Sequence, residues 1–351
     1  MNIISNINKQ NWIKRWAGSY TFISCSYWGR QYYVELKREL GAQFDHTLFI
    51  HKRGVVTFLI PKSEFESFGR RMVEEIQHDP AKALARLDTL KTNTDKLSGM
   101  IRKLGNTIPT ITEYQEFKKC FSYHLPLHNF MKKTVDFLPD DLLQELLPRF
   151  KEARVYSEHI YSDTEHFFRS IAAKIAEGEH ISADLPTCLT EDELESYLMT
   201  GGLPDKDVLE KRFEQSILYF EEGKQHLLVE DDVGQVEKML ETTLVHDGLK
   251  GTPAFKGTAR GIARVILDPH RTAVFNRGDI LVTGMTRPEF LPFVEKAAAI
   301  VTDAGGVLCH AAIIARELKK PCIIGTEHAT RTIKDGNLLE IDAASGIIRI
   351  I

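Results

Sequence analysis

The sequence contains little cysteine and no long apolar run. Its five cysteines, in 351 residues, are odd in number and scattered, which suits neither a disulfide framework nor a zinc site: they are Cys25, Cys120, Cys188, Cys309 and Cys322. No uninterrupted apolar stretch approaches the roughly 20 residues that span a bilayer. The N-terminal segment MNIISNINKQNWIKRW also lacks the apolar core of a signal peptide. We therefore expect a protein of the reducing cytoplasm, with no membrane partner.

An excess of either charge is also missing. The chain has 45 Lys and Arg against 49 Asp and Glu, a net charge of −4 with neutral histidine. This balance gives no reason to expect nucleic acid as the main partner. The length suffices for two or three domains with cores of their own.

The first 245 residues divide into two predicted regions. Residues 1–60 predict a small β-rich segment, because SYTFISCSYW, RQYYVEL and HTLFIHKRGVVTFLI alternate in strand fashion, with Gly54 at a turn. Residues 61–245 are mostly helical in pattern, with breaks at GNTIPT and TGGLPD. Together they predict an α+β N-terminal region that is mostly helical with a small β element. The expected helices include KSEFESFGRRMVEEIQ, PAKALARLDTLKTNTDKLSGMIRKL and DKDVLEKRFEQSILYFEEGKQHLL.

The pattern changes after HDGLKGTP, residues 246–253, which we predict to be a hinge linker. Residues 254–351 then alternate short strands with short helices and predict a compact α/β domain. The expected strands are ARGIARVIL, DILVTG, AAIVTD, PCIIG, NLLEID and GIIRII, and the expected helices are PEFLPFVEKA, LCHAAIIAREL and a short turn near His328.

One histidine, His310, follows a glycine pair and begins an apolar helical run in TDAGGVLCHAAIIAREL. A helix start carries unpaired N–H groups and the positive end of the helix dipole, so it suits an anion such as a phosphoryl group. The neutral imidazole is a nucleophile near neutral pH. Local chemistry leaves two alternatives open, a phosphorylated histidine and a histidine that caps or packs at a helix start.

Four segments of this region resemble the swivelling phosphohistidine domain of the phosphoenolpyruvate-utilising enzymes. That family includes phosphoenolpyruvate synthase, pyruvate phosphate dikinase, rifampin phosphotransferase and enzyme I of the sugar phosphotransferase system. The resemblance implies a β/β/α swivelling domain over about 100 residues. The matching segments are KGTARGIARVI (256–266), GDILVTGMTRPEF (278–290), AAAIVTDAGGVLCHAAIIARELKKPCIIGT (297–326) and KDGNLLEIDAASGIIRI (334–350).

The resemblance assigns roles by position. His310 becomes the phosphorylated residue, and Gly305 and Gly306 become the turn at which the backbone approaches the phosphate. Thr286 matches a loop threonine near the imidazole or the phosphoryl group. Cys309 matches a small helix-start residue that also belongs to the phosphate-binding set.

Two further positions, Arg316 and Leu308, are compared with the family pattern. Arg316 falls in the helix after His310, where a packing or salt-bridge role is favoured over phosphate contact. Leu308 replaces the threonine of the synthase and dikinase branch and indicates a divergent, rifampin phosphotransferase-like branch.

The family mechanism implies a partner. An ATP-grasp domain transfers a phosphoryl group to the histidine, and the small domain then carries it to an acceptor. Residues 1–245 have neither the length nor the glycine-rich loop of an ATP-grasp domain, and no βα barrel follows. We therefore expect a phosphotransferase component that carries phosphate on His310 and that depends on a separate ATP-grasp protein for ATP and Mg²⁺, with an unknown small-molecule acceptor. The alternative is a non-catalytic regulatory or interaction protein that keeps the swivelling fold.

Two arginines are candidates for binding that acceptor. Segments 150–171 and 184–213 resemble helices that precede the swivelling domain in rifampin phosphotransferase-like proteins, where they contribute to the acceptor site. Arg154 and Arg212 lie in these segments and could hold an anionic group by two hydrogen bonds each. A salt-bridged or solvated role is the favoured alternative.

One helix face offers a possible metal site. His159, Asp163 and His166 fall at helical spacing, with Glu158 or Glu165 nearby. A polar helix face is favoured, so no metal is expected.

A second histidine pair, His124 and His128, lies on either side of Pro126, which is expected to disturb the helix there.

Overall fold

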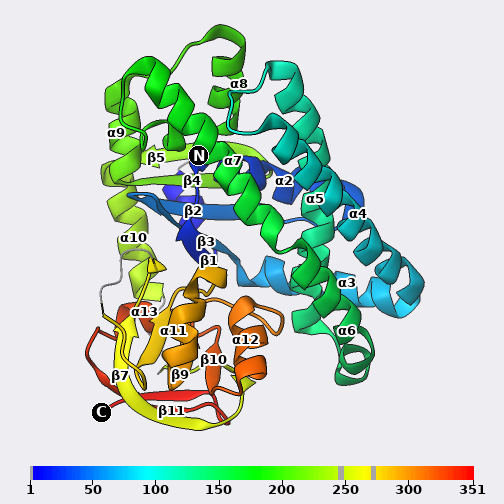
Figure 1. Cartoon of the computed structure of the whole chain (residues 1–351), viewed down its shortest axis with the longest axis vertical. Helices are drawn as coiled ribbons and strands as arrows, with labels where there is room; N and C mark the ends of the chain where they lie inside the picture. Colours follow the sequence, from blue (N-terminus) through cyan, green and yellow to red (C-terminus); the bar gives the residue numbers. More distant parts are fainter. Residues whose placement is uncertain (1–2, 244–248, 270–273) are drawn as a thin grey trace. The chain divides into compact units, whose positions relative to one another are not determined.

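The computed structural model describes residues 3–243, 249–269 and 274–351 (Figure 1). Contacts divide it into two compact units. We call them the N-terminal unit, made of Met1–Gln10, Ser19–Val56 and Ile60–Val236, and the C-terminal unit, made of Asn11–Gly18, Thr57–Leu59 and Glu237–Ile351. The C-terminal unit therefore takes two short segments from the first 60 residues.

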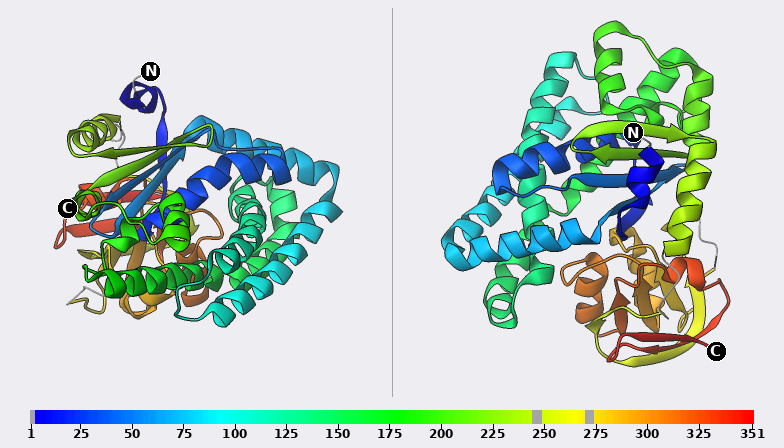
Figure 2. Two further views of the ribbon diagram at one scale, coloured as in Figure 1. Left: turned by 90° about the horizontal axis from the view of Figure 1, so that it is seen from above. Right: turned by 180° about the vertical axis from the view of Figure 1, so that it is seen from behind.

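The N-terminal unit is mostly helical, as predicted. Helix α4 packs against α3, α5, α6 and α7, and Figures 1 and 2 show α4 and α5 side by side. Aromatic side chains fill the space between α2, α5 and α7, with the Tyr27 and Phe121 rings stacked at 4.9 Å and the Phe117 and Phe167 rings 5.0 Å apart. The helices are α1 (Ile3–Asn8), α2 (Phe22–Leu40), α3 (Lys62–His78), α4 (Pro80–Leu104), α5 (Ile111–Thr134), α6 (Asp140–Ser157), α7 (His159–Glu179), α8 (Glu191–Thr200) and α9 (Lys206–Glu214), followed by α10 (Asp231–Thr243).

A five-stranded sheet has the order β1-β3-β2-β4-β5. Helix α2 packs across β2, β4 and β5 (Figure 1). The approach is close at Gly29, where an added Cβ would lie 2.1 Å from the ring of Phe220, so only glycine fits. The strands are β1 (Trp12–Ser19), β2 (His46–Lys52), β3 (Val55–Pro61), β4 (Ser216–Glu221) and β5 (Lys224–Val229).

The strands predicted from SYTFISCSYW (19–28) and RQYYVEL (30–36) are wrong, because Phe22–Leu40 forms the helix α2. Thr21 caps its start by accepting a hydrogen bond from the Ser24 amide, and Gly41 ends it in the left-handed conformation with φ 63°. Aromatic and β-branched residues are abundant because most faces of α2 are buried, which hides the helical period. The hairpin predicted around Gly54 is confirmed as β2 and β3, with positive φ at Arg53 and Gly54.

The long helix predicted at 205–228 is also wrong. It ends at Glu214, and the rest forms the hairpin of β4 and β5, which turns at Glu222 and Gly223 with φ 50° and 77°. β4 pairs antiparallel with β2, from His46 opposite Glu221 to His51 opposite Ser216. This pairing joins the two ends of the N-terminal unit and stabilises a strand whose local pattern resembles a helix.

The expected disturbance at Pro126 does not occur, since α5 continues through it. The predicted breaks between α4 and α5 and between α8 and α9 are both found.

The C-terminal unit is an α/β fold, as expected. Its sheet has the order β12-β11-β7-β8-β9-β10-β6, in which β7, β8, β9 and β10 run parallel. All six predicted strands are present, and the sequence missed β6. The strands are β6 (Thr252–Phe255), β7 (Thr258–Val265), β8 (Ile280–Thr283), β9 (Ala299–Thr302), β10 (Cys322–Ile324), β11 (Leu338–Asp342) and β12 (Ile347–Ile350), and the helices are α11 (Leu291–Lys296), α12 (His310–Leu318) and α13 (Ala329–Thr332).

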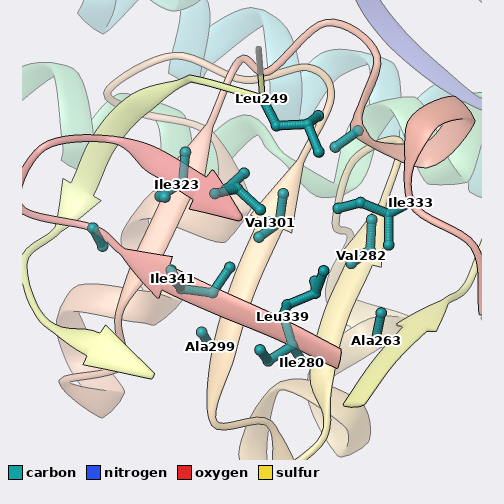
Figure 3. Close-up of a cluster of buried hydrophobic side chains, with 13 residues drawn as sticks. Leu249, Ala263, Ile280, Val282, Ala299, Val301, Ile323, Ile333, Leu339 and Ile341 are labelled. Carbon is teal, nitrogen blue, oxygen red and sulfur yellow. The ribbon is translucent and has the colours of Figure 1, made fainter. Parts of the chain in front are cut away.

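Alternate residues of the parallel strands enter two cores. Figure 3 shows Ile280 of β8 beside Leu339 of β11, and Val282 of β8 beside Ile333, in the first of these cores. Leu281 faces the other way and joins a second cluster with Ala311, Ala312 and Ala315 of α12. The start of α12 is thereby fixed against the sheet.

The predicted linker falls partly outside the described residues. Residues 246–248 are not described, whereas Leu249 is buried in the core of Figure 3, Lys250 bridges to Ile347, and β6 begins at Thr252. The described end of the linker is thus part of the folded C-terminal unit.

Candidate phosphohistidine site

His310 is the first residue of α12 and lies at the end of the loop that follows β9. Cys309 caps the helix with extended backbone, and its Sγ accepts a hydrogen bond from the Ala312 amide at 3.4 Å. This is the small helix-start position that the sequence predicted. The His310 residue is only 9% exposed, so its ring is held in place rather than loose on the surface.

Thr286 holds the His310 ring. Its Oγ1 lies 2.9 Å from His310 Nδ1, and Thr286 is 3% exposed. In the tautomer with the proton on Nδ1, this hydroxyl accepts the hydrogen bond and Nε2 carries the lone pair. In that tautomer Nε2 is the nucleophilic nitrogen.

The glycine pair shapes the loop between β9 and α12. Gly305 has φ 146°, and an added Cβ would lie 2.9 Å from Cys309 Sγ. The Gly306 carbonyl accepts a hydrogen bond from the Cys309 amide at 2.9 Å. Both predicted glycines thus lie beside His310, while their contact with a phosphate stays a prediction.

Asp303 begins the same loop and is a junction of hydrogen bonds. Its amide donates to the Thr283 carbonyl at 3.0 Å, and its carbonyl accepts from the Glu327 amide at 2.8 Å. Its carboxylate accepts from both the amide and the hydroxyl of Thr330. The loops after β8, β9 and β10 are therefore tied together at one residue.

Lys14 completes this junction, and the sequence did not predict it. Its Nζ lies 2.6 Å from Asp303 Oδ2, and the two side chains are 7% and 0% exposed. The available signal was a lysine inside the apolar stretch WIKRW. Nothing in that stretch indicates a carboxylate 289 residues away.

Arg316 and Leu308 have structural contacts. Arg316 donates a hydrogen bond from Nη1 to the Val307 carbonyl at 2.7 Å and so fixes the loop before His310. This agrees with the role favoured from the sequence. Leu308, which replaces the threonine of the synthase branch, is buried at 2% exposure.

The two acceptor candidates, Arg154 and Arg212, are buried and paired with carboxylates in the N-terminal unit. Arg154 Nη2 lies 2.8 Å from Glu158 Oε1. Arg212 forms two hydrogen bonds with Glu193, at 2.7 and 2.8 Å, which link α9 to α8. These contacts support the ion-paired role that was favoured over substrate binding.

The residues of the possible metal face have other partners. Glu158 pairs with Arg154, Glu165 accepts a hydrogen bond from the Thr21 amide, and His159 Nε2 lies 3.1 Å from Ser98 Oγ. Within residues 3–243, 249–269 and 274–351 there is no group of three or more His, Cys, Asp or Glu suited to a metal ion.

His124 and His128 lie in the core of the N-terminal unit. The His128 ring centroid is 4.3 Å from that of Tyr161, and the His124 ring is 6.0 Å from both. Burial lowers the pKa of His124 to about 3 and that of His128 well below its usual value. Neither nitrogen of His124 has a hydrogen-bond partner among the described residues.

The histidine, its threonine and the glycine turn lie together at the start of α12 in the C-terminal unit. Residues 275–346 match the family model described as "PEP-utilising enzyme, mobile domain". This match to the mobile-domain model agrees with the resemblance found in the sequence.

Several curated proteins are similar to parts of the chain. A probable phosphoenolpyruvate synthase of Archaeoglobus fulgidus is 34% identical over 187 residues, which cover 49% of this chain and 24% of that protein. One of Staphylothermus marinus is 46% identical over 102 residues, or 28% and 12% of the two chains. The uncharacterized phosphotransferase YvkC of Bacillus subtilis is 39% identical over 122 residues, or 35% and 14%. The chain therefore matches less than a quarter of each relative's length.

Solved structures give low overall scores. Aconitase X of Thermococcus kodakaraensis covers 29% of this chain, with 97% of its own chain matched, a TM-score of 0.25 and 20% identity. A solution structure of Enzyme I covers 79% of each chain with a TM-score of 0.21 and 12% identity. The assignment of the fold rests on the strand order given above.

No helix of the described ranges is long and apolar enough to cross a membrane.

Proposed function

We propose that this chain is the phosphoryl-carrying component of a phosphotransferase. His310 accepts a phosphoryl group from a nucleotide bound by a separate ATP-grasp protein and passes it to a small-molecule acceptor. The observation that carries the proposal is the hydrogen bond between Thr286 and Nδ1 of His310, because it orients Nε2 as the nucleophile at a helix start.

Phosphoryl loading is a substitution at phosphorus. The Nε2 lone pair of His310 forms a nitrogen–phosphorus bond while the bond from phosphorus to the departing oxygen of the nucleotide breaks, and its electron pair leaves with that oxygen. Nδ1 keeps its proton and its hydrogen bond to Thr286, so the positive charge that develops on the ring is stabilised by an oxygen acceptor. ATP and Mg²⁺ enter through the partner, where the metal supplies charge neutralisation on the phosphates.

Transfer to the acceptor reverses this substitution. An acceptor hydroxyl forms an oxygen–phosphorus bond and gives its proton to solvent water, while the electron pair of the nitrogen–phosphorus bond returns to Nε2. Dividing the reaction into two steps makes each easier. The helical region that precedes the mobile domain is the proposed location of the acceptor, where Arg154 and Arg212 are ion-paired with Glu158 and Glu193.

The setting that we propose is the reducing cytoplasm. None of the five cysteines forms a disulfide, and Cys309 beside His310 would be vulnerable in an oxidising compartment.

Potassium phosphoramidate tests the carrier role without any partner, because it phosphorylates histidines chemically. The rate at each histidine is read by peptide mass spectrometry under alkaline conditions. We expect His310 to gain an acid-labile phosphoryl group faster than the exposed His78 and His166, although His310 is buried. Equal or slower labelling of His310 would contradict the proposal.

Two variants complete this test. His310→Asn removes the rapid phase, whereas His328→Asn, a control in the same unit, keeps it. Addition of ATP, Mg²⁺ and a candidate ATP-grasp protein then separates a carrier from a non-catalytic regulatory protein. A regulatory protein would gain no phosphoryl group from the nucleotide with any partner tried.

A further inference from the structure

Lys14 is placed beside both loops of the phosphohistidine site. β1 brings it into the C-terminal unit, where its Nζ lies 2.6 Å from Asp303 Oδ2. A Cβ built on Gly284 would be 3.7 Å from the same Nζ, so the ammonium also lies next to the loop that carries Thr286. The two loops are joined there by a hydrogen bond from the Ala304 amide to the Gly284 carbonyl at 2.9 Å.

We infer that Lys14 is a positioning residue for phosphoryl transfer at His310, acting through Asp303. The inference rests on the proposed function. Lys14 holds the Asp303 carboxylate in the orientation that binds Thr330, and it neutralises a negative charge at the start of the loop that ends at His310.

Because the ion pair of Lys14 and Asp303 is buried, loss of the Lys14 charge would have a large effect on the site. The Asp303 side chain is 0% exposed, so water cannot screen it. A phosphoryl group brings up to about two negative charges to the site. Without Lys14, an uncompensated carboxylate would repel that group and would also be free to reorient within the loop.

Asp303 transmits a change at Lys14 to His310, because the Asp303 backbone contacts both loops of the site. Its amide binds the Thr283 carbonyl at the end of β8, three residues before Thr286, and its side chain binds the start of α13. A shift of Asp303 therefore moves both loops that meet at the hydrogen bond between Thr286 and His310.

The test uses the full chain, because a fragment beginning at residue 254 would lack Lys14. The rate of His310 labelling by phosphoramidate is measured for wild type, Lys14→Met and Lys14→Arg. We expect Lys14→Met to slow labelling by roughly tenfold, within the range of coupling between contacting charged groups. Lys14→Arg keeps the charge and recovers most of the rate. Lys256→Met, an exposed lysine of the same unit, removes the same charge and leaves the rate unchanged.

A double-mutant cycle with Asp303→Asn separates positioning from general stability. In that background no buried carboxylate needs a partner, so Lys14→Met should slow labelling by no more than about twofold. This comparison remains informative if Lys14→Met alone folds poorly. An equal effect of Lys14→Met in both backgrounds, or none in the folded single variant, would overturn the inference.

Ionic strength gives a second reading that a purely structural role would not change. The labelling rate of Lys14→Met should rise with ionic strength, because salt screens the exposed charge on phosphoramidate from the uncompensated carboxylate. A variant whose salt profile matches that of the wild type contradicts the charge role. Failure of wild-type His310 to label would instead reject the proposed function and leave the ion pair as a structural fact.

Discussion

Thr286 Oγ1 lies 2.9 Å from His310 Nδ1, although the two residues come from different loops that follow different strands. In the tautomer with the proton on Nδ1, Nε2 carries the lone pair and is the nitrogen that we propose for phosphoryl transfer. Thr286→Val removes the hydroxyl and keeps the shape of the side chain. We expect His310 to be labelled by phosphoramidate about five- to tenfold more slowly, the value of one buried hydrogen bond.

Thr286→Ser is the matched control, since it keeps the hydroxyl. It should label within about twofold of wild type, and the melting temperatures of both variants should stay close to that of the wild type. A normal rate for Thr286→Val would show that the hydrogen bond does not orient the nucleophile.

Gly305 is required by both its backbone and its neighbours. Gly305→Ala places a Cβ 2.9 Å from Cys309 Sγ at φ 146°, and we expect a loss of about 2–3 kcal/mol in the free energy of unfolding. Gly336→Ala is the control, because Gly336 has φ 87° but no atom within 4 Å of an added Cβ. It should lose about 1 kcal/mol. Equal losses in urea denaturation would mean that the Cys309 contact does not matter.

Glu165 makes the stability of the N-terminal unit depend on pH. Burial raises the pKa of its carboxyl to about 7, although Arg169 and hydrogen bonds from Ser24 and Thr21 oppose the shift. The folded state therefore holds a proton that the unfolded state releases near its usual pKa of 4.5. The resulting stability is fully present below pH 4.5 and is lost as the pH rises through 7, by about 3 kcal/mol.

Glu165→Gln tests this linkage. The variant should show a flatter dependence of unfolding free energy on pH between 4.5 and 7 than the wild type does. Glu177→Gln, an exposed residue of the same helix, should keep the wild-type slope. Parallel profiles for wild type and Glu165→Gln would show that this carboxyl does not titrate in that range.

His124 destabilises the unit in acid. Its pKa is lowered to about 3 by burial and, less, by His159, so its contribution to stability is present above pH 6.5 and is lost as the pH falls toward 3. His124→Phe removes both polar nitrogens from an apolar position, and we expect a gain of about 1 kcal/mol at neutral pH and a larger gain at pH 5.

His166→Phe, at an exposed position of α7, is the control and should change the free energy of unfolding by less than about 0.5 kcal/mol. A marked loss of stability in His124→Phe would show that a bound polar group satisfies the His124 ring.

The parts of the site that the sequence predicted are those that a short segment encodes. His310, Cys309 and the glycines lie within a few residues of one another, and the strand–loop–helix pattern around them determines their arrangement. Thr286 was found because it lies in a second segment whose spacing also matches the family. Lys14 was not found from the sequence. Its ion pair with Asp303 depends on which strand packs beside which loop, and a local sequence pattern does not indicate this packing.

In the fold, too, the elements with a clear local pattern were predicted and those decided by long-range packing were not. α3 and α4 were predicted because each has a clear helical period and ends at a glycine or proline boundary. α2 was mistaken for strands because burial on most faces removes that period. The hairpin of β4 and β5 was mistaken for helix, since its pairing with β2, more than 160 residues earlier, decides its structure.

The composition of the C-terminal unit has a consequence for how the protein folds during synthesis. The chain passes between the two units five times, after residues 10, 18, 56, 59 and 236. Lys14 therefore leaves the ribosome 289 residues before its partner Asp303. The strand that carries Lys14 must remain available until Asp303 has been made, and closing so long a loop is slow. The surroundings of His310 are thus completed only after this long-range contact has formed.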